Sequence, residues 1–189
     1  MGLMAKNIIL WRRLDLPGHE FGELHPHGDG WELSGTALFS HEQQPCRLGY
    51  LVLCDSRWRT ISARVRGAIA EREVDLTVSR DAEGKWQFNG ADCPAVADCT
   101  DIDLGFSPST NLLPIKRLSL AVGEDAEVSA AWLPFPSLVL QPLAQVYRRE
   151  GERTYRYESG GGSFVRILEV NAAGFVTGYP GVWEAESTA

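Results

Sequence analysis

The sequence contains few cysteines and few lysines, and it has no long hydrophobic run. Its four cysteines, Cys46, Cys54, Cys93 and Cys99, include no pair at the C-x-x-C spacing of structural zinc sites. No histidine follows them in zinc-finger register. We therefore expect no structural zinc, and we expect the cysteines to be reduced, as they are in cytoplasmic proteins.

No segment approaches the ~18 consecutive apolar residues that a membrane-spanning helix needs. The apolar run Ile8–Trp11 is too short for the hydrophobic part of a signal peptide and leads directly into Arg12 and Arg13. Lys6 occupies the fourth position after Gly2, where a myristoylation signal needs serine or threonine. We therefore expect a cytoplasmic protein without a transmembrane segment.

The chain also lacks an excess of positive charge. Its formal net charge is -7 at pH 7 and its pI is about 5.1, so no overall positive field attracts nucleic acid. Of the 18 basic residues, only Lys6, Lys85 and Lys116 are lysines. Arginine suits fixed bidentate or stacked contacts better than lysine does, although compositional bias explains the excess equally well.

The sequence contains no complete catalytic or cofactor motif. Gly105–Ser109 lacks the final glycine of a G-x-S-x-G nucleophile elbow, and Gly160–Gly162 is not followed by the lysine of a phosphate-binding loop. His25–Asp29 carries two imidazoles and a carboxylate that would suit zinc or copper, but its proline and the neighbouring glycines favour an exposed loop. We therefore predict no metal and no cofactor.

Asp101 and Asp103 have the D-x-D spacing of metal-dependent sugar transferases, in which paired carboxylates hold a divalent ion near a diphosphate. No pattern of a parallel α/β nucleotide domain surrounds them. They lead into Ser107–Asn111, a polar run that suits capping and turn hydrogen bonds. An enzyme of glycolipid or sugar metabolism that uses the two carboxylates is kept as an alternative.

Hydrophobicity alternates with a period of two along most of the chain, which is the pattern of half-buried strands. In Trp31–Phe39 the odd positions are mostly apolar, whereas Leu48–Cys54 is apolar at both parities and is predicted to be covered on both faces. Further strands, joined by glycine- and asparagine-rich turns, are predicted at residues 57–65, 74–79, 86–88, 128–133, 137–149, 154–158, 163–170 and 174–179.

Two of these strands carry more specific expectations. In residues 57–65, Ile61, Ala63 and Val65 are predicted to share the buried side. For the strand predicted at residues 137–149, Pro136 just before it and Pro142 within it indicate an edge strand or a bulge, because proline cannot donate a ladder hydrogen bond.

One segment has helical spacing, in which Leu112, Ile115, Leu118 or Ser119, and Val122 follow one face. Thr110 or Asn111 is expected to cap this helix, Pro114 is tolerated in its first turn, and Gly123 is expected to end it. Many hairpins around one short helix predict a sheet that curls on itself. We therefore expect a mainly β protein with a single domain over residues 1–189.

The strands predicted at residues 57–65, 137–149 and 154–158 each carry aromatic and polar side chains on one face. This pattern is the best indication of a binding surface in the sequence. Aromatic rings contact the C–H face of a sugar, while hydroxyl, amide and guanidinium groups bind its hydroxyls. A hydrated outer face with ordinary cross-strand aromatic pairs would give the same pattern.

The segment from Cys99 to Leu118, CTDIDLGFSPSTNLLPIKRL, is long enough to be specific. It resembles the signature of the glycolipid-binding family of bacterial proteins, and Lys116, where arginine is usual, is a conservative departure. Shorter matching pieces flank it at residues 11–15, 131–138 and 178–183. The resemblance extends from about Trp11 to Trp183, nearly the whole chain.

The resemblance implies a spiral β-roll, in which a long, many-stranded and largely antiparallel sheet wraps around a single short α-helix, and it implies a homodimer. It transfers no established catalytic or ligand residues. We therefore expect non-enzymatic binding, transport or handling of a glycolipid or related amphiphile, with a protein-interaction scaffold as a further alternative.

Two sets of residues are assigned to this function. The candidate ligand-binding residues are Trp58, Arg64, Arg66, Asp103, Tyr147, Tyr155 and Tyr157. The residues expected to form a lipid-compatible interior are Leu51, Leu53, Trp132 and Val139.

Overall fold

The structure, a computed structural model, describes residues 7–189; Gly2 and Lys6, on which the lipidation prediction depends, lie outside the described residues. The strands are β1 (Asn7–Arg13), β2 (Gly18–His27), β3 (Gly30–His41), β4 (Gln44–Cys54), β5 (Thr60–Ile69), β6 (Arg72–Arg80), β7 (Trp86–Phe88), β8 (Ala91–Asp92), β9 (Asp101–Leu104), β10 (Asp125–Leu133), β11 (Gln141–Arg149), β12 (Thr154–Ser159), β13 (Phe164–Val170), β14 (Val176–Tyr179) and β15 (Trp183–Thr188). The helix α1 (Leu112–Leu118) follows a 3-10 turn at Ser109–Asn111, and two further 3-10 turns lie at Pro94–Val96 and Gly160–Gly162.

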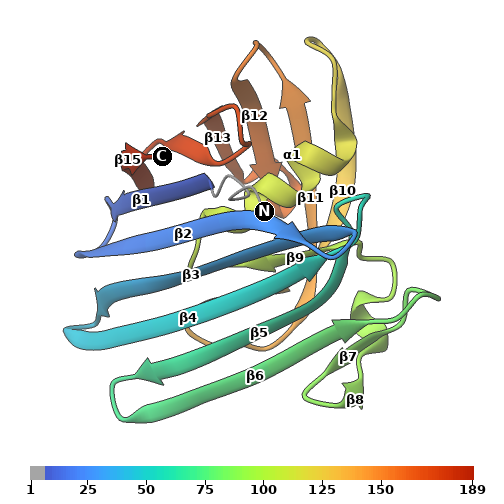
Figure 1. Cartoon of the computed structure of the whole chain (residues 1–189). Helices are drawn as coiled ribbons and strands as arrows, with labels where there is room; N and C mark the ends of the chain where they lie inside the picture. Colours follow the sequence, from blue (N-terminus) through green and yellow to red (C-terminus); the bar gives the residue numbers. More distant parts are fainter. Residues whose placement is uncertain (1–6) are drawn as a thin grey trace, which may run out of the picture.

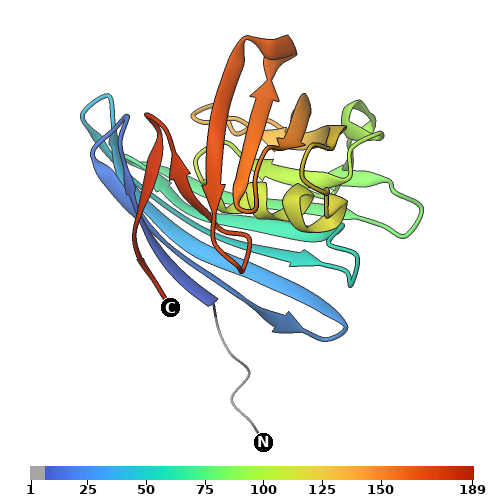
Figure 2. The same cartoon turned by 90° about the horizontal axis from the view of Figure 1, so that it is seen from above.

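Within residues 7–189, all strands belong to one sheet in the order β8-β7-β6-β5-β4-β3-β2-β1-β15-β14-β13-β12-β11-β10-β9. Neighbouring strands are antiparallel, except that β9 runs parallel to β10. The sheet curls so far that β9 returns beside the start of β5, where the Ile102 amide donates to the Thr60 hydroxyl at 3.0 Å (Figure 1). The helix α1 lies between the two halves of the curled sheet (Figure 2). The predicted mainly β roll around a short helix is therefore confirmed.

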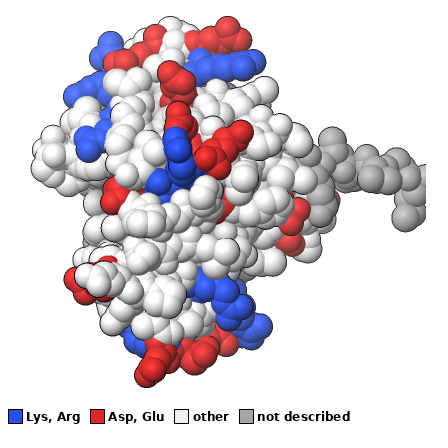
Figure 3. All heavy atoms as spheres, turned by 90° about the vertical axis from the view of Figure 1, so that its left-hand side faces the viewer, with Lys and Arg blue, Asp and Glu red and all other residues white. Residues whose placement is uncertain are grey.

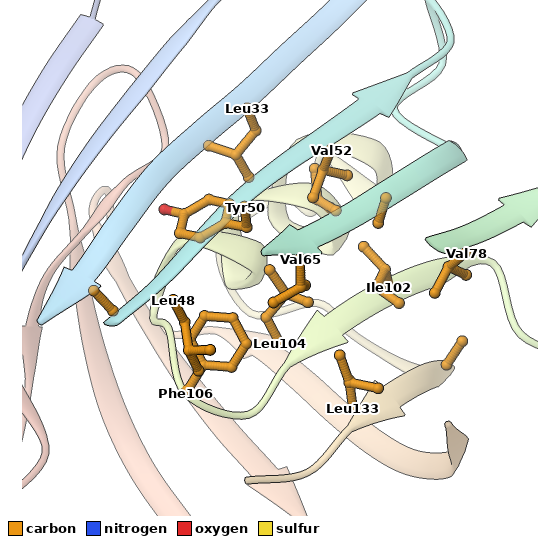
Figure 4. Packing of buried hydrophobic residues seen from close by; sticks show 14 of the residues in the cluster. Leu33, Leu48, Tyr50, Val52, Val65, Val78, Ile102, Leu104, Phe106 and Leu133 are labelled. Carbon is orange, nitrogen blue, oxygen red and sulfur yellow. The ribbon is translucent and has the colours of Figure 1, made fainter. Parts of the chain in front are cut away.

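Side chains from the inner face of β3–β6 meet those of β9 and β10 in the core. Figure 4 shows Leu48, Val52 and Val65 directed toward Leu104 and Phe106, and all five are buried. Because side chains alternate across a strand, the inner faces of these strands are mostly apolar, with a few buried polar residues such as Thr60, and the outer faces meet water. The packed core fills this part of the roll.

The strand β4 buries only one of its two apolar faces. Its even positions, from Cys46 to Cys54, point into the core, whereas Leu51 is 38% exposed and Leu53 is partly buried. The prediction that β4 is covered on both faces is wrong, as is the interior position of Leu51. Val139, in the loop before β11, is 59% exposed, and Trp132 is partly buried at a pocket described below.

A β-bulge reverses the expected parity at the start of β5. Leu53 pairs with Ser62, but the next residue, Cys54, pairs with Thr60, so Ile61 has no partner in the ladder. The extra residue turns Ile61 outward, where it is exposed, and buries Thr60. Ala63 and Val65 are buried as predicted, and Ile61 is not.

The helix is shorter than predicted. It ends at Leu118 because Ser119 adopts a left-handed conformation with φ 46°, well before Gly123, and Val122 is 61% exposed. Pro114 lies in the first turn as expected. Asn111 makes no side-chain cap; its amide donates to the Tyr147 hydroxyl at 2.8 Å. The Thr110 hydroxyl instead accepts from the Leu104 amide at 3.1 Å, which ties the helix to β9.

The strand predicted at residues 137–149 begins only at Gln141, because residues 134–140 form turns in which Leu138 has a φ of 53°. β11 pairs with β10 on one side and β12 on the other, so it is not an edge strand. The edges of the sheet are β8 and β9. Pro142 is accommodated near the start of the strand, opposite Ala131.

The segment His25–Asp29 is not an exposed loop throughout, because His25–His27 completes β2 and only Gly28 and Asp29 form the turn into β3. The His25 and His27 rings lie 3.1 Å and 3.4 Å from the Glu32 carboxylate. Within the described part of the chain, no group of three or more His, Cys, Asp or Glu side chains is arranged to hold a metal ion.

Candidate functional site: an aromatic pocket inside the roll

A pocket of about 530 Å³ lies where β1, β9, β10, β12, β14 and β15 approach one another. Five of its wall residues are aromatic: Trp132, Tyr157, Phe164, Tyr179 and Trp183. Three more carry charge: Arg13, Asp15 and Asp103. This aromatic pocket combines apolar rings with a few charged groups, which is the composition typical of small-molecule sites.

Three of the rings form a mutually packed group. Tyr157 lies 6.2 Å from Phe164 and 6.3 Å from Tyr179 between ring centroids, and Phe164 lies 6.2 Å from Tyr179. These side chains come from three consecutive strands, β12, β13 and β14, whose pairing fixes their positions. Behind them Tyr147 packs on Tyr157 at 5.0 Å. The aromatic wall is therefore positioned by strand pairing and by contacts between its rings.

Asp103 is the acceptor in this wall. Its Oδ2 accepts from Gln145 Nε2 at 2.6 Å, and the same nitrogen lies 3.0 Å from the Tyr157 hydroxyl. Burial raises the pKa of Asp103 to about 6, an effect that the Gln145 hydrogen bond opposes and the nearby Asp101 charge reinforces. Within residues 7–189, no protein donor bonds to Oδ1, so this oxygen remains available to a ligand hydroxyl.

Arg13 is the donor. Its guanidinium lies between the rings of Phe39 and Trp183, 4.7 Å and 5.1 Å from their centroids, and its side chain is 8% exposed. Asp15 accepts from Nε at 2.8 Å and from Nη2 at 3.1 Å. The remaining nitrogen, Nη1, is buried and has no partner among the described residues. An unsatisfied buried donor is costly, and Arg13 is one of the residues that line the pocket.

A second buried carboxyl group lies behind the pocket. Glu20 Oε1 accepts from the hydroxyls of Ser107 at 2.5 Å and Tyr50 at 2.7 Å, and Ser107 itself belongs to the pocket wall. Burial raises the pKa of Glu20 to about 8, although its hydrogen bonds and the charge of Arg13 act in the opposite direction. Glu20 is therefore mostly protonated at neutral pH.

A family model described as "Putative glycolipid-binding" matches residues 8–185. The chain belongs to this family. A crystal structure of a DUF1089 family protein from Pseudomonas aeruginosa is similar to the chain, with a TM-score of 0.78 and 31% sequence identity over 87% of this chain and 91% of that chain. No curated protein compared with the chain matches it. The resemblance found in the sequence is thereby confirmed.

The structure brings together only some of the candidate residues of this glycolipid-binding family member. Asp103 and Tyr157 line the aromatic pocket, and Tyr147 lies directly behind it. Tyr155 points to the same side of β12 but lines a different cavity, near the end of α1, where Arg149 lies over its ring at 5.8 Å.

Trp58, Arg64 and Arg66 lie elsewhere. Arg64 and Arg66 are exposed on the outer face of β5, where both bond to Asp75 and hold the pKa of that carboxyl below its ordinary value. Trp58 lies in the turn before β5 and stacks on Trp31, with ring centroids 4.6 Å apart. The involvement of Arg64 and Arg66 in ligand binding stays a prediction, for a surface separate from the aromatic pocket.

Asp101 and Asp103 of the D-x-D motif have different partners. Arg117, from α1, holds Asp101 through three contacts of 2.6 to 3.2 Å, whereas Asp103 bonds to Gln145. Burial raises the pKa of Asp101, and the Arg117 bonds oppose this shift. One carboxylate therefore anchors the helix to β9, and the other faces the pocket.

Reasoning from sequence missed Arg13, Tyr179 and Trp183 as pocket residues. They lie in the flanking segments of the family signature, residues 11–15 and 178–183, which was the available signal. Nothing local could place them beside Asp103, because contacts between β1, β9 and β14 depend on the winding of the sheet.

On the face shown in Figure 3, acidic and basic side chains lie in small groups of both signs with uncharged residues between them. Within the described range, no helix has the length and apolar character needed to cross a membrane.

Proposed function

We propose that this protein binds a glycolipid or a related amphiphile without chemically changing it, and that the sugar head group occupies the aromatic pocket. The observation that carries the proposal is a cavity walled by five aromatic rings that Arg13 and Asp103 also line. Sugars present C–H faces to rings and hydroxyls to charged groups. The volume of about 530 Å³ lies within the roughly 300–1,000 Å³ of small-molecule sites.

The polar groups of the pocket have complementary roles in this proposal. The Arg13 guanidinium donates to a head-group oxygen, and Asp103 Oδ1 accepts from a hydroxyl. Both side chains are already fixed, Arg13 by two rings and Asp15, and Asp103 by Gln145. Preorganised groups lose little conformational entropy on binding, which favours affinity.

The apolar part of the ligand would leave the pocket at its rim. Leu143 and Val182 line the pocket, and the exposed Leu14 lies next to Val182, whose carbonyl accepts from the Leu14 amide at 2.8 Å. Each methylene that the rim shields from water would contribute about 0.8 kcal/mol. Because the adjacent core is filled with side chains, we do not propose that the acyl chain enters it.

The test is calorimetric titration of a panel of glycolipids into wild type, Asp103→Asn and Trp132→Ala. Losing the charge-assisted contact at Asp103 should weaken binding by roughly ten- to a hundredfold. Thermal melts would check that both variants are folded. Absence of binding across the panel by folded wild-type protein would refute the proposal.

Arg64→Ala is the matched control, since Arg64 is exposed on the outer face and bonds only to Asp75 among the described residues. Binding unchanged in Arg64→Ala and weakened in Asp103→Asn supports the aromatic pocket. The reverse result would move the site to the outer face of β5, as the sequence-based choice of Arg64 and Arg66 predicts.

An enzyme that uses Asp103 is the alternative, and one observation favours it. A carboxyl group with a pKa of about 6 exchanges a proton near neutrality, as a general acid or base must. Mass spectrometry of the lipid before and after incubation separates the two functions. An unchanged mass supports binding, and a changed mass supports catalysis.

The homodimer and the cytoplasmic location belong to the same proposal. Large apolar side chains are exposed on the outer face of β2–β5: Phe21, Leu38, Leu51 and Ile61. A second copy would cover part of this face. A sedimentation measurement that gives a particle of 20.8 kDa at micromolar concentration would contradict the dimer. The protein-interaction scaffold is less favoured, because it predicts a molecule without a cavity.

A further inference from the structure

Another cavity, of about 450 Å³, lies beside the turn between β4 and β5 and shares no lining residue with the aromatic pocket. Four arginines line it: Arg57, Arg59, Arg80 and Arg117. Trp58 and Thr100 complete the wall. In a chain with a net charge of -7, this arginine pocket is a local concentration of positive charge.

The turn that presents Arg57 and Arg59 is rigid. Asp55 Oδ1 accepts from the backbone amides of Arg57 at 2.8 Å and Arg59 at 2.9 Å, and the Asp55 carbonyl accepts from the Trp58 amide at 3.0 Å. Trp58 has a φ of 65°, which is unusual for a residue with a large side chain. In this conformation its ring stacks on Trp31, with 12° between the ring planes.

The guanidinium groups are only partly neutralised. Arg117 is paired with the buried Asp101, which orients it. Within residues 7–189, no acidic side chain forms an ion pair with Arg57, Arg59 or Arg80. Among the described residues the buried Arg80 Nε has no hydrogen-bond partner, and Lys116 Nζ lies 6.0 Å from the centroid of the Trp58 ring. Asp101 pairs with Arg117, and Asp55 binds the backbone amides of the turn, so the four arginines of the lining outnumber these two carboxylates.

We propose that the arginine pocket is a binding site for a phosphate or diphosphate group carried on an organic molecule. Guanidinium groups bind phosphate oxygens through paired hydrogen bonds, and several of them together match a group with more than one negative charge. The ring of Trp58, which stacks on Trp31, forms an apolar part of the wall for the organic part. The proposal does not depend on occupancy of the aromatic pocket.

The test is titration calorimetry with inorganic pyrophosphate, using wild type and two double variants. Arg57→Ala/Arg59→Ala removes two charges from the pocket. Arg64→Ala/Arg66→Ala removes the same charge from the outer face of β5, where both arginines bond to Asp75. Because Arg57 and Arg59 side chains are exposed and Asp55 binds only their backbone amides, the pocket variant should fold.

We expect the pocket variant to bind pyrophosphate at least about tenfold more weakly, and the outer-face variant to stay within about twofold of wild type. A parallel flotation assay compares vesicles of phosphatidylcholine with and without phosphatidic acid. Binding of pyrophosphate points to a soluble phosphate ester, and binding confined to phosphatidic acid vesicles points to a lipid head group. Neither ligand binding, or equal weakening by both double variants, would overturn the proposal.

Discussion

The Ser107 hydroxyl donates to Glu20 Oε1 at 2.5 Å, across 87 residues of sequence. This hydrogen bond connects β2 to the loop after β9, directly behind the aromatic pocket. It joins a pocket residue to a carboxyl group whose pKa is raised by burial, and it makes the protonation of Glu20 part of the stability of the roll.

Because of Glu20, the stability of the protein should decrease as the pH rises. The pKa of Glu20 in the folded protein, about 8, exceeds its ordinary value of 4.5. Its contribution to the free energy of unfolding is therefore complete below about pH 4.5 and is lost as the pH rises through 8. The slope should reach at most about 1.4 kcal/mol per pH unit between these values. Glu20→Gln cannot ionise, so its urea-denaturation free energy should lack this slope. Parallel pH profiles for the two proteins would contradict the assignment.

Asp103 should make ligand affinity depend on pH near 6. The ionised carboxylate accepts a hydroxyl more strongly than the protonated form does, and the pKa of Asp103 is about 6. Affinity for a glycolipid identified in the panel should therefore fall as the pH decreases through 6. In Asp103→Asn the affinity should be weaker and independent of pH over this range, as calorimetry at several pH values would establish. A pH dependence that persists in the variant would assign the effect to another group.

Ile115→Asp should destabilise the protein by several kcal/mol, because the helix buries Ile115 inside the roll and an unpaired charge there is costly. Val122→Asp is the control, since Val122 lies beyond the helix and is largely exposed. Thermal melts of the two variants should differ widely. A melting temperature for Ile115→Asp within a degree or two of wild type would place the helix outside the core.

Thr60→Val should loosen the contact that completes the roll. The buried Thr60 hydroxyl accepts from the Ile102 amide, and valine retains the shape of the side chain without the acceptor. The unsatisfied amide should cost about 1–3 kcal/mol. Hydrogen exchange at the Ile102 amide should accelerate beyond the change in global stability. Unchanged exchange there would show that β9 is held by β10 alone.

The sequence predicted the class of the fold well, but it predicted less well which face of each strand is buried. Alternation located most strands and the helical stripe located α1, because these patterns are local. The inward face of β4 could not be chosen, since Tyr50 and Leu51 are both apolar, and only the first is buried. The bulge at Ile61 was also invisible, because one unpaired residue changes the parity without changing the composition.

The site was predictable in part. Asp103 and Tyr157 were chosen for their residue types, and the structure shows both in one pocket wall. Arg64 was chosen on the same grounds and lies on the opposite face of the sheet. The difference depends on which way each strand faces after the sheet has wound, which involves pairings between residues far apart in sequence.

The pairing of β1 with β15 has a consequence for connectivity. These first and last strands of the described chain are neighbours in the middle of the sheet, and the Ile8 amide donates to the Ala189 carbonyl at 2.8 Å. The two edges, β8 and β9, are joined by residues 93–100 in the middle of the sequence. A circular permutant with its old ends linked and new ends in that connection would follow the sheet from one edge to the other. Every strand would then pair with its neighbour in sequence, and the most distant pairing in the molecule would become a local turn.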